Sequence, residues 1–236
     1  MVFKTRVFTS ASKENFLKKI RVWDLPTRLF HWSLVVCVVG LVVSGNLGGN
    51  AMVWHFRLGY AVLTLVLFRL IWGFIGGHWS RFATFIPGPL TLISYLKGDT
   101  KPEHSVGHNP LGAFSVLALL FFSFAQATVG LMSDDEIAAA GPLVSKIPGA
   151  WVALATFIHT EVTKVVLVVL VLLHIVAILW YRFKKGENLI KPMIVGDKSL
   201  PDSTRASNDT SASRIAAAVV LLICAGAVNM LLRWAA

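Results

Sequence analysis

The chain has 236 residues, of which 56% are hydrophobic and only 14% charged, and its mean hydropathy is +0.69. A soluble domain carries about a quarter charged residues, so this composition excludes an ordinary cytoplasmic enzyme and a disordered chain, and two cysteines are too few for a secreted disulfide scaffold. The net charge of +10 accompanies apolar blocks, so we expect the cations to mark one side of a bilayer and not to bind nucleic acid.

Five apolar blocks are long enough to cross a bilayer, which takes about 20 mostly apolar residues in a helix. We place them at about 29–44, 55–75, 111–132, 151–181 and 215–234. The predicted fold class is an all-α integral membrane protein, with a four-helix transmembrane bundle and a fifth, C-terminal transmembrane helix. The predicted organisation is an N-terminal segment 1–28, a four-helix domain 29–196, a polar linker 197–213 and a last helix 214–236.

The segments between the blocks differ in character. A short Gly-rich turn follows the first block, so the first two spans should be antiparallel neighbours. Residues 89–96 are expected to form a short helix in the interface, and 197–213 reads as a flexible linker. The basic N-terminal segment lacks a cleavable signal pattern, so the first block should be retained as a span.

The distribution of Lys and Arg predicts the orientation. Seven lie in 1–28, three in the loop after the second span and seven after the fourth span, which together make 17 of the 22. Because positive charge is retained on the inner side, the N-terminus should be cytoplasmic and, with five spans, the C-terminus periplasmic.

Four of the seven histidines lie within the predicted spans: His31, His55, His159 and His174. An ionisable residue inside a membrane is costly and is a functional hypothesis by default. A single one can be a neutral hydrogen-bonding group between helices, but four call for a common explanation.

The directions of the spans pair these histidines by depth. His31 and His174 should lie near the inner face, and His55 and His159 near the outer face. His159 and His174 are 15 residues apart, which on an ideal helix is about 22 Å along the axis and a rotation of about 60°. One helix can therefore serve two stacked sites.

Two imidazoles at each depth fit the axial ligands of haem b. Zinc needs four protein ligands, or three and a water, and no thiol or carboxylate lies at these depths. A proton relay would use mid-span Asp or Glu. We therefore predict two haem b groups, each held by two histidines and restricted to one-electron transfer because no open position remains on the iron.

Three arginines are candidate partners for the haem propionates. Arg69 should lie at the inner level, Arg57 at the outer level and Arg28 at the inner edge. For Arg28 and Arg57, a side chain that simply reaches the membrane surface explains the position equally well.

Several motifs resemble the bacterial cytochrome b561 and nickel–iron-hydrogenase cytochrome b family. They are Arg21-Val-Trp-Asp-Leu-Pro-Thr-Arg-Leu-Phe-His31-Trp32, Trp54-His-Phe-Arg-Leu-Gly-Tyr60, Phe68-Arg-Leu-Ile-Trp-Gly73, Gly107-His-Asn-Pro-Leu-Gly112 and Glu187-Asn-Leu-Ile190. The resemblance implies that four helices bind two b haems through the same four histidines. One departure is that the family usually has His-Glu early in the fourth span, whereas this chain has His159-Thr160-Glu161. The longer ligand spacing predicts a local bulge or a tilt.

The resemblance also suggests a function. We expect a di-haem cytochrome in the bacterial cytoplasmic (inner) membrane that carries electrons between quinone and a periplasmic redox protein such as cytochrome c. The acidic residues 134–136 at the outer side favour a cationic partner. Two alternatives are a stand-alone superoxide:quinone oxidoreductase and the membrane anchor of a hydrogenase or dehydrogenase complex.

A quinone site is suggested by similarity to formate-dehydrogenase membrane subunits, in which a polar residue near the start of the third span contacts quinone. In this chain the corresponding residues are His108 and Asn109. A plain helix start explains these two residues at least as well.

Overall fold

The computed structural model describes residues 17–98 and 106–236. Residues 1–16 of the predicted N-terminal segment, and Lys101 among the counted cations, lie outside the described residues. Within the described part, five helical stretches are long and apolar enough to cross a membrane. They are α1 (Leu25–Leu47), α2 (Met52–Ile75), α5 (Pro110–Gly130), the stretch Gly149–Lys184 and α9 (Ser211–Ala235). The structure thus confirms the helical class and the five predicted spans.

The remaining elements are short. The stretch Gly149–Lys184 consists of α6 (Gly149–Phe157), a π-helical turn η5 (Ile158–Thr163) and α7 (Lys164–Lys184). The other elements are β1 (Leu17–Arg21), η1 (Gly49–Ala51), η2 (His78–Ser80), α3 (Phe82–Phe85), α4 (Pro89–Leu96), η4 (Val144–Lys146), α8 (Ile190–Val195) and β2 (Asp197–Pro201). The short helix expected at 89–96 is therefore present as α4.

Polar caps set the starts of the long helices outside their apolar blocks. Asp24 accepts a hydrogen bond from the Thr27 amide at 2.8 Å and is followed by Pro26, so α1 begins four residues before the apolar block that predicted it. Asn109 caps α5 in the same way through the Gly112 amide at 2.7 Å.

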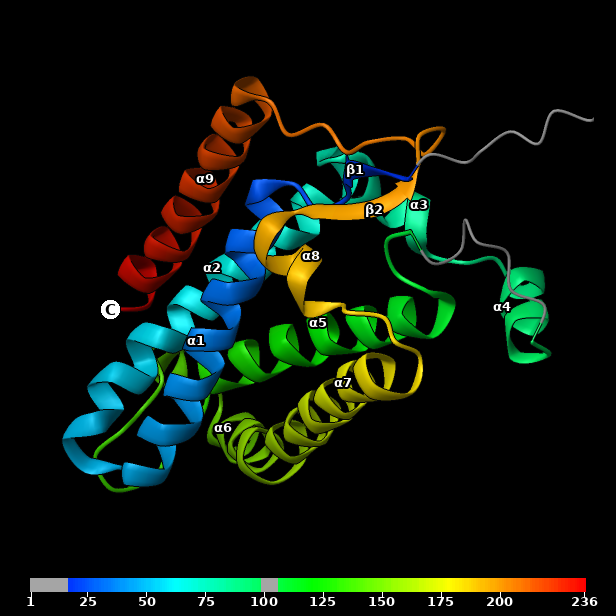
Figure 1. Cartoon of the computed structure of the whole chain (residues 1–236). Helices are drawn as coiled ribbons and strands as arrows, with labels where there is room; N and C mark the ends of the chain where they lie inside the picture. The colour runs from blue at the N-terminus through cyan, green and yellow to red at the C-terminus, as the bar shows by residue number, and fades with distance from the viewer. Residues whose placement is uncertain (1–16, 99–105) are drawn as a thin grey trace, which may run out of the picture.

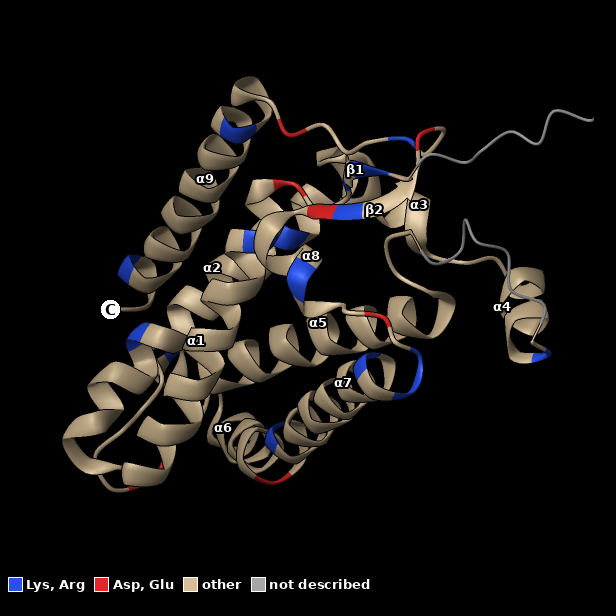
Figure 2. Ribbon diagram, viewed as in Figure 1, with Lys and Arg blue, Asp and Glu red and all other residues tan. Residues whose placement is uncertain are grey.

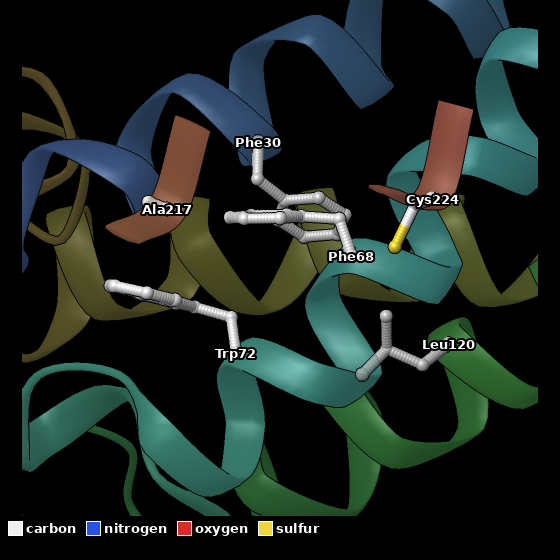
Figure 3. Close-up of a cluster of buried hydrophobic side chains, with 6 residues drawn as sticks. All are labelled: Phe30, Phe68, Trp72, Leu120, Ala217 and Cys224. Atoms are coloured by element: carbon white, nitrogen blue, oxygen red, sulfur yellow. The ribbon is translucent and has the colours of Figure 1, made fainter. Parts of the chain in front are cut away.

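The helices pack around α2. In Figure 1, α1 and α2 run side by side, with α9 on one side of this pair and α5 on the other, and α7 packs against α5. Figure 3 shows the buried cluster that joins them, in which Phe30 of α1 lies against Phe68 of α2. The other members of the cluster are Trp72, Leu120, Ala217 and Cys224. Helix α9 is therefore part of the packed structure through Ala217 and Cys224.

The outer surfaces of the long helices are apolar. Large side chains such as Val36, Phe74 and Leu222 are 69–73% exposed, which is the reverse of a water-soluble surface and suits contact with lipid tails. In Figure 2 the long helices are mostly tan, and blue Lys and Arg residues lie on β1, β2, α8 and the end of α7. The charge distribution is that of a multi-pass membrane protein.

Residues 197–213, which we expected to form a flexible linker, are instead bonded to the N-terminal strand. Residues 197–201 form β2, which pairs antiparallel with β1 from Leu17↔Pro201 to Arg21↔Asp197. Further along, the Ser207 amide donates to Arg21 O at 2.7 Å and its hydroxyl to Val22 O at 2.6 Å. The polar composition suggested flexibility, but these polar groups pair with the N-terminal strand, a contact that local composition does not reveal.

Candidate functional site

The structure brings together His55 of α2 and His159 of η5, the pair predicted at the outer level (the outer pair). Their ring centroids are 6.2 Å apart and the ring planes are at 86°. A bond between a metal and an imidazole nitrogen is about 2.0–2.1 Å long. Two such bonds and the two ring radii add up to about this separation, which is the spacing expected of two imidazoles that share one metal ion.

Backbone carbonyls fix the protonation of both rings. Nδ1 of His55 lies 3.1 Å from Leu41 O, and Nδ1 of His159 lies 3.1 Å from Gln126 O. A carbonyl only accepts, so each Nδ1 must carry the hydrogen and each Nε2 keeps its lone pair. This is the tautomer that a metal-binding histidine needs.

Each of these rings also packs against a glycine on the helix that supplies the carbonyl. A Cβ on Gly45 would lie 3.1 Å from Cε1 of His55, and a Cβ on Gly130 would lie 2.8 Å from Cε1 of His159. In both cases the glycine comes four residues after the accepting carbonyl, at Leu41 and Gln126. The absent side chain lets the imidazole reach the helix backbone.

His159 lies inside the π-helical turn Ile158–Thr163. This is the local bulge that the longer spacing between His159 and Glu161 predicted. A π-turn takes up one extra residue. It reduces the effective separation of His159 and His174 to 14 residues, which corresponds to a rotation of about 40° instead of about 60° on a regular helix.

The pair predicted at the inner level (the inner pair) is His31 of α1 and His174 of α7. The two side chains are close enough to interact electrostatically, and His108 interacts with both of them. Nδ1 of His31 is buried and has no hydrogen-bond partner among the described residues. The inner imidazole thus lacks the carbonyl support that both outer rings have.

Arg69 is the predicted arginine that the structure buries, close enough to His108 to interact with it electrostatically. Its side chain is 2% exposed, Nη2 donates to Ser80 O at 2.9 Å, and its charge lies 5.0 Å from the Phe82 ring. Nη1 is buried without a partner among the described residues. Such an unsatisfied buried donor is what a cofactor carboxylate would use.

The other two predicted arginines are engaged elsewhere. Arg57 is exposed with its charge 5.1 Å from the Trp54 ring, and two residues on a helix separate it from His55 by about 200°. Arg28 donates from Nη1 to Ile194 O at 2.7 Å and lies 3.9 Å from Asp209. The structure therefore shows no contact of Arg57 with the outer pair among the described residues, and Arg28, which was predicted at the inner edge, is bonded to other protein groups there.

His108 and Asn109 lie at the inner end of α5. The His108 ring is 4.7 Å from both the Trp23 and the Phe85 rings, and its buried Nδ1 has no partner among the described residues. Burial, followed by the positive charge of Arg69, lowers the pKa of His108 to about 3. His108 is therefore neutral at any physiological pH.

Asn109 belongs to a chain of polar groups that links three helices. Besides capping α5, its Nδ2 donates to the Tyr181 hydroxyl of α7 at 2.7 Å, and that hydroxyl lies 2.9 Å from the Tyr95 hydroxyl of α4. The helix-start interpretation of Asn109 is thus correct, and the residue also has a second contact.

Sequence reasoning missed two polar residues, the buried Asp24 and the partly buried Gln126. Asp24 is fully buried and accepts four hydrogen bonds, from the Thr27 and Gly77 amides, the Trp72 indole and the Ser80 hydroxyl. Its position just before Pro26 was the available signal. Gln126, a lone amide in the middle of α5, contacts His159.

The donor set fits haem. The described residues contain no group of three or more His, Cys, Asp and Glu side chains that would hold a metal ion, which argues against a closed zinc site. Two facing imidazoles, glycine cradles and an unsatisfied buried arginine are instead the features that a haem between helices requires.

Comparisons with known proteins agree with this chemistry. The family model described as prokaryotic cytochrome b561 matches residues 22–196. A probable Ni/Fe-hydrogenase B-type cytochrome subunit of Azotobacter vinelandii is 26% identical over 238 residues, which cover 86% of this chain and 98% of that protein. Proteins of the same description are 25% identical in Bradyrhizobium diazoefficiens, over 78% of this chain and 87% of the relative, and 24% identical in Cupriavidus necator, over 79% and 89%.

Proposed function

The chain belongs to the prokaryotic cytochrome b561 family, and on this premise we propose that it is a di-haem cytochrome that moves electrons across the membrane. A b-type cytochrome carries haem b, which when bound supplies reversible one-electron chemistry. The observation that carries the proposal is the outer pair, two imidazoles from different helices with centroids 6.2 Å apart and both Nδ1 atoms directed to carbonyls.

In this proposal each histidine has a defined role. His55 and His159 hold the outer haem through Nε2, while Leu41 O and Gln126 O keep the hydrogen on Nδ1 and orient the rings. His31 and His174 hold the inner haem.

Arg69, with its free Nη1, binds a propionate of the inner haem. Arg28 at the inner edge, whose Nε is also buried without a partner among the described residues, and Arg57 at the outer level remain the further candidates for the propionates.

We place the quinone site at the inner end, next to His108 and Asn109. A neutral imidazole with a free Nδ1 can form a hydrogen bond to a quinone carbonyl. Because His108 lies near Arg69 and the inner histidines, the distance for electron transfer from this site to the inner haem would be short. If this is correct, His108→Leu slows quinone reduction by the reduced protein and leaves both haem spectra unchanged.

The proposed location is the bacterial cytoplasmic (inner) membrane. The cation count puts the N-terminus in the cytoplasm and the C-terminus in the periplasm, so His55 and His159 lie toward the periplasm. Electrons then pass between quinone at the inner side and a redox protein at the outer side.

The partner on the outer side is a redox protein such as cytochrome c. Glu136 and Asp135 are exposed on the loop that precedes α6, and a negative surface attracts a cationic partner. The same charges repel superoxide, which weakens the alternative of a superoxide:quinone oxidoreductase.

A second candidate function is the membrane anchor of a hydrogenase. It is favoured by the names of the relatives, which are Ni/Fe-hydrogenase cytochrome subunits. A large catalytic subunit that co-purifies in mild detergent would support this candidate, and purification with a c-type cytochrome would support the first.

The test is the haem content of the purified protein. We expect two b haems per chain with the low-spin spectrum of six-coordinate iron, one haem in His55→Ala and one spectrally different haem in His31→Ala. A protein without haem would contradict the proposal. Loss of the same haem from both variants would contradict the pairing by depth.

A further inference from the structure

Gln126 of α5 contacts the π-turn that carries His159 at several points. Its backbone carbonyl accepts from Nδ1 of His159 at 3.1 Å, and its side-chain Nε2 donates to the His159 carbonyl at 3.2 Å. Its Oε1 accepts a hydrogen bond from the Thr163 hydroxyl, and that hydroxyl also lies 3.0 Å from Ile158 O. One residue of α5 is therefore bonded to both ends of the turn.

These contacts support the π-turn. Its backbone bonds run i→i+5 in place of the regular i→i+4 ladder, and inside a membrane no water can satisfy a carbonyl that such a change leaves poorly bonded. Gln126 donates to the His159 carbonyl, and the single hydrogen of the Thr163 hydroxyl is shared between Gln126 Oε1 and Ile158 O. The turn is thus stabilised by two specific side chains.

The amide of Gln126 also reaches the ligand nitrogen. Its Nε2 is 3.4 Å from Nε2 of His159 and 3.2 Å from the His159 carbonyl. An amide nitrogen has two hydrogens, so it donates to both acceptors. A metal at His159 Nε2 would replace the longer of these contacts, and the shorter one to the carbonyl would remain.

We propose that Gln126 and Thr163 are the positioning residues of the outer haem, because together they hold the π-turn and so fix the direction of the His159 imidazole. The inference rests on the proposed function, since it concerns a ligand of the haem. It adds that side-chain hydrogen bonds of Gln126 in α5 and of Thr163 in the turn stabilise the extra residue between His159 and His174. Neither residue touches the iron.

The experiment compares ferric low-spin EPR signals and haem content in variants of the full chain in detergent. Gln126→Leu removes the side-chain contacts and keeps the backbone carbonyl, and Thr163→Val removes the hydroxyl alone. We expect the signal that is missing in His159→Ala to shift in both variants, while the other haem signal stays in place. Haem affinity at the outer site should fall, by about 10–100-fold for Gln126→Leu, as for other residues that support metal ligands.

Two further variants serve as controls. Thr163→Ser keeps the hydroxyl and should restore the wild-type signal. Thr128→Val makes the same change as Thr163→Val on α5, where the exposed hydroxyl bonds only to Phe124 O of its own helix at 2.8 Å, and it should change neither signal.

The outcomes separate this inference from the proposed function. A wild-type protein without two haems contradicts the proposed function itself. Two haems in the wild type with unshifted outer signals in Gln126→Leu and Thr163→Val contradict the positioning role alone. If Gln126→Leu fails to assemble, Thr163→Val decides the question, because it removes a single hydroxyl.

Discussion

At the scale of single residues, the outer histidines are supported by a repeated local arrangement. His55 and His159 each donate to a carbonyl of a neighbouring long helix and lie against the glycine four residues after it. A carbonyl oxygen has two lone pairs, so it can accept from the ring as well as from its own helix. A Cβ at that place would press on the ring, at 2.8 Å for Gly130 and 3.1 Å for Gly45.

Gly130→Ala should therefore displace the His159 ring. The new Cβ would lie 2.8 Å from Cε1, a contact that real side chains avoid, so we expect outer haem content to fall by about tenfold or more, as measured by the visible spectrum per mole of protein. Gly226→Ala in α9 is the matched control, because its Cβ meets nothing within 4 Å. An unchanged outer haem in Gly130→Ala would show that the ring has freedom to move.

At the scale of elements, Asp24 ties the start of α1 to the end of α2 and to η2. Its carboxylate accepts from the Trp72 indole of α2 at 3.2 Å, from the Gly77 amide at 2.9 Å and from the Ser80 hydroxyl of η2 at 3.0 Å. Since Ser80 O also accepts from Arg69, the same loop orients the arginine proposed for the inner haem.

Asp24→Asn should destabilise this junction, because the amide presents hydrogens where three donors already point. An unsatisfied buried polar group costs about 1–3 kcal/mol, so the melting temperature in detergent should fall clearly. Ser80→Ala, which removes one of the donors, should have a smaller effect. Equal melting temperatures for Asp24→Asn and the wild type would mean that the network contributes little.

At the scale of the whole molecule, Asp209 connects the two ends of the chain. Its side chain is 5% exposed and is bonded to Arg21 of β1 at 3.2 Å, to the Leu25 amide of α1 at 3.2 Å and to Arg214 of α9 at 2.9 Å. Burial by itself raises the pKa of Asp209, but the Arg214 hydrogen bond, the Leu25 amide and the charges of Arg214 and Arg21 lower it below 3.8.

The stability that Asp209 provides should therefore depend on pH. A carboxyl with a depressed folded-state pKa stabilises fully above its unfolded pKa, here about 3.8, and loses this effect as the pH falls further through the folded pKa. We expect the difference in melting temperature between the wild type and Asp209→Asn to be largest above pH 4 and to shrink on acidification.

Asp202→Asn is the control for this measurement. Its ion pair with Lys18 is highly exposed, with side chains 66–67% accessible, and exposed pairs contribute little. A pH-independent difference between the wild type and Asp209→Asn would contradict the assigned role of Asp209.

The departure from the family's His-Glu spacing offered a bulge or a tilt near His159, and the structure has the bulge. The sequence by itself determined the membrane class, the five spans and the short helix at 89–96. These follow from local composition and helix periodicity, which hydrophobic blocks in a bilayer express strongly. It also singled out Arg69, because a charge in the middle of an apolar helix is unusual.

Only the tertiary structure decided which side chains meet across elements. The pairing of β1 with β2 joins residues about 180 apart, and the support of His159 by Gln126 and Gly130 depends on how α5 packs against the π-turn. Likewise, Arg28 and Arg57 have other contacts because of the faces on which they lie. Such contacts depend on packing between segments that are far apart in the chain. Composition and spacing do not reveal them, because they describe each segment alone.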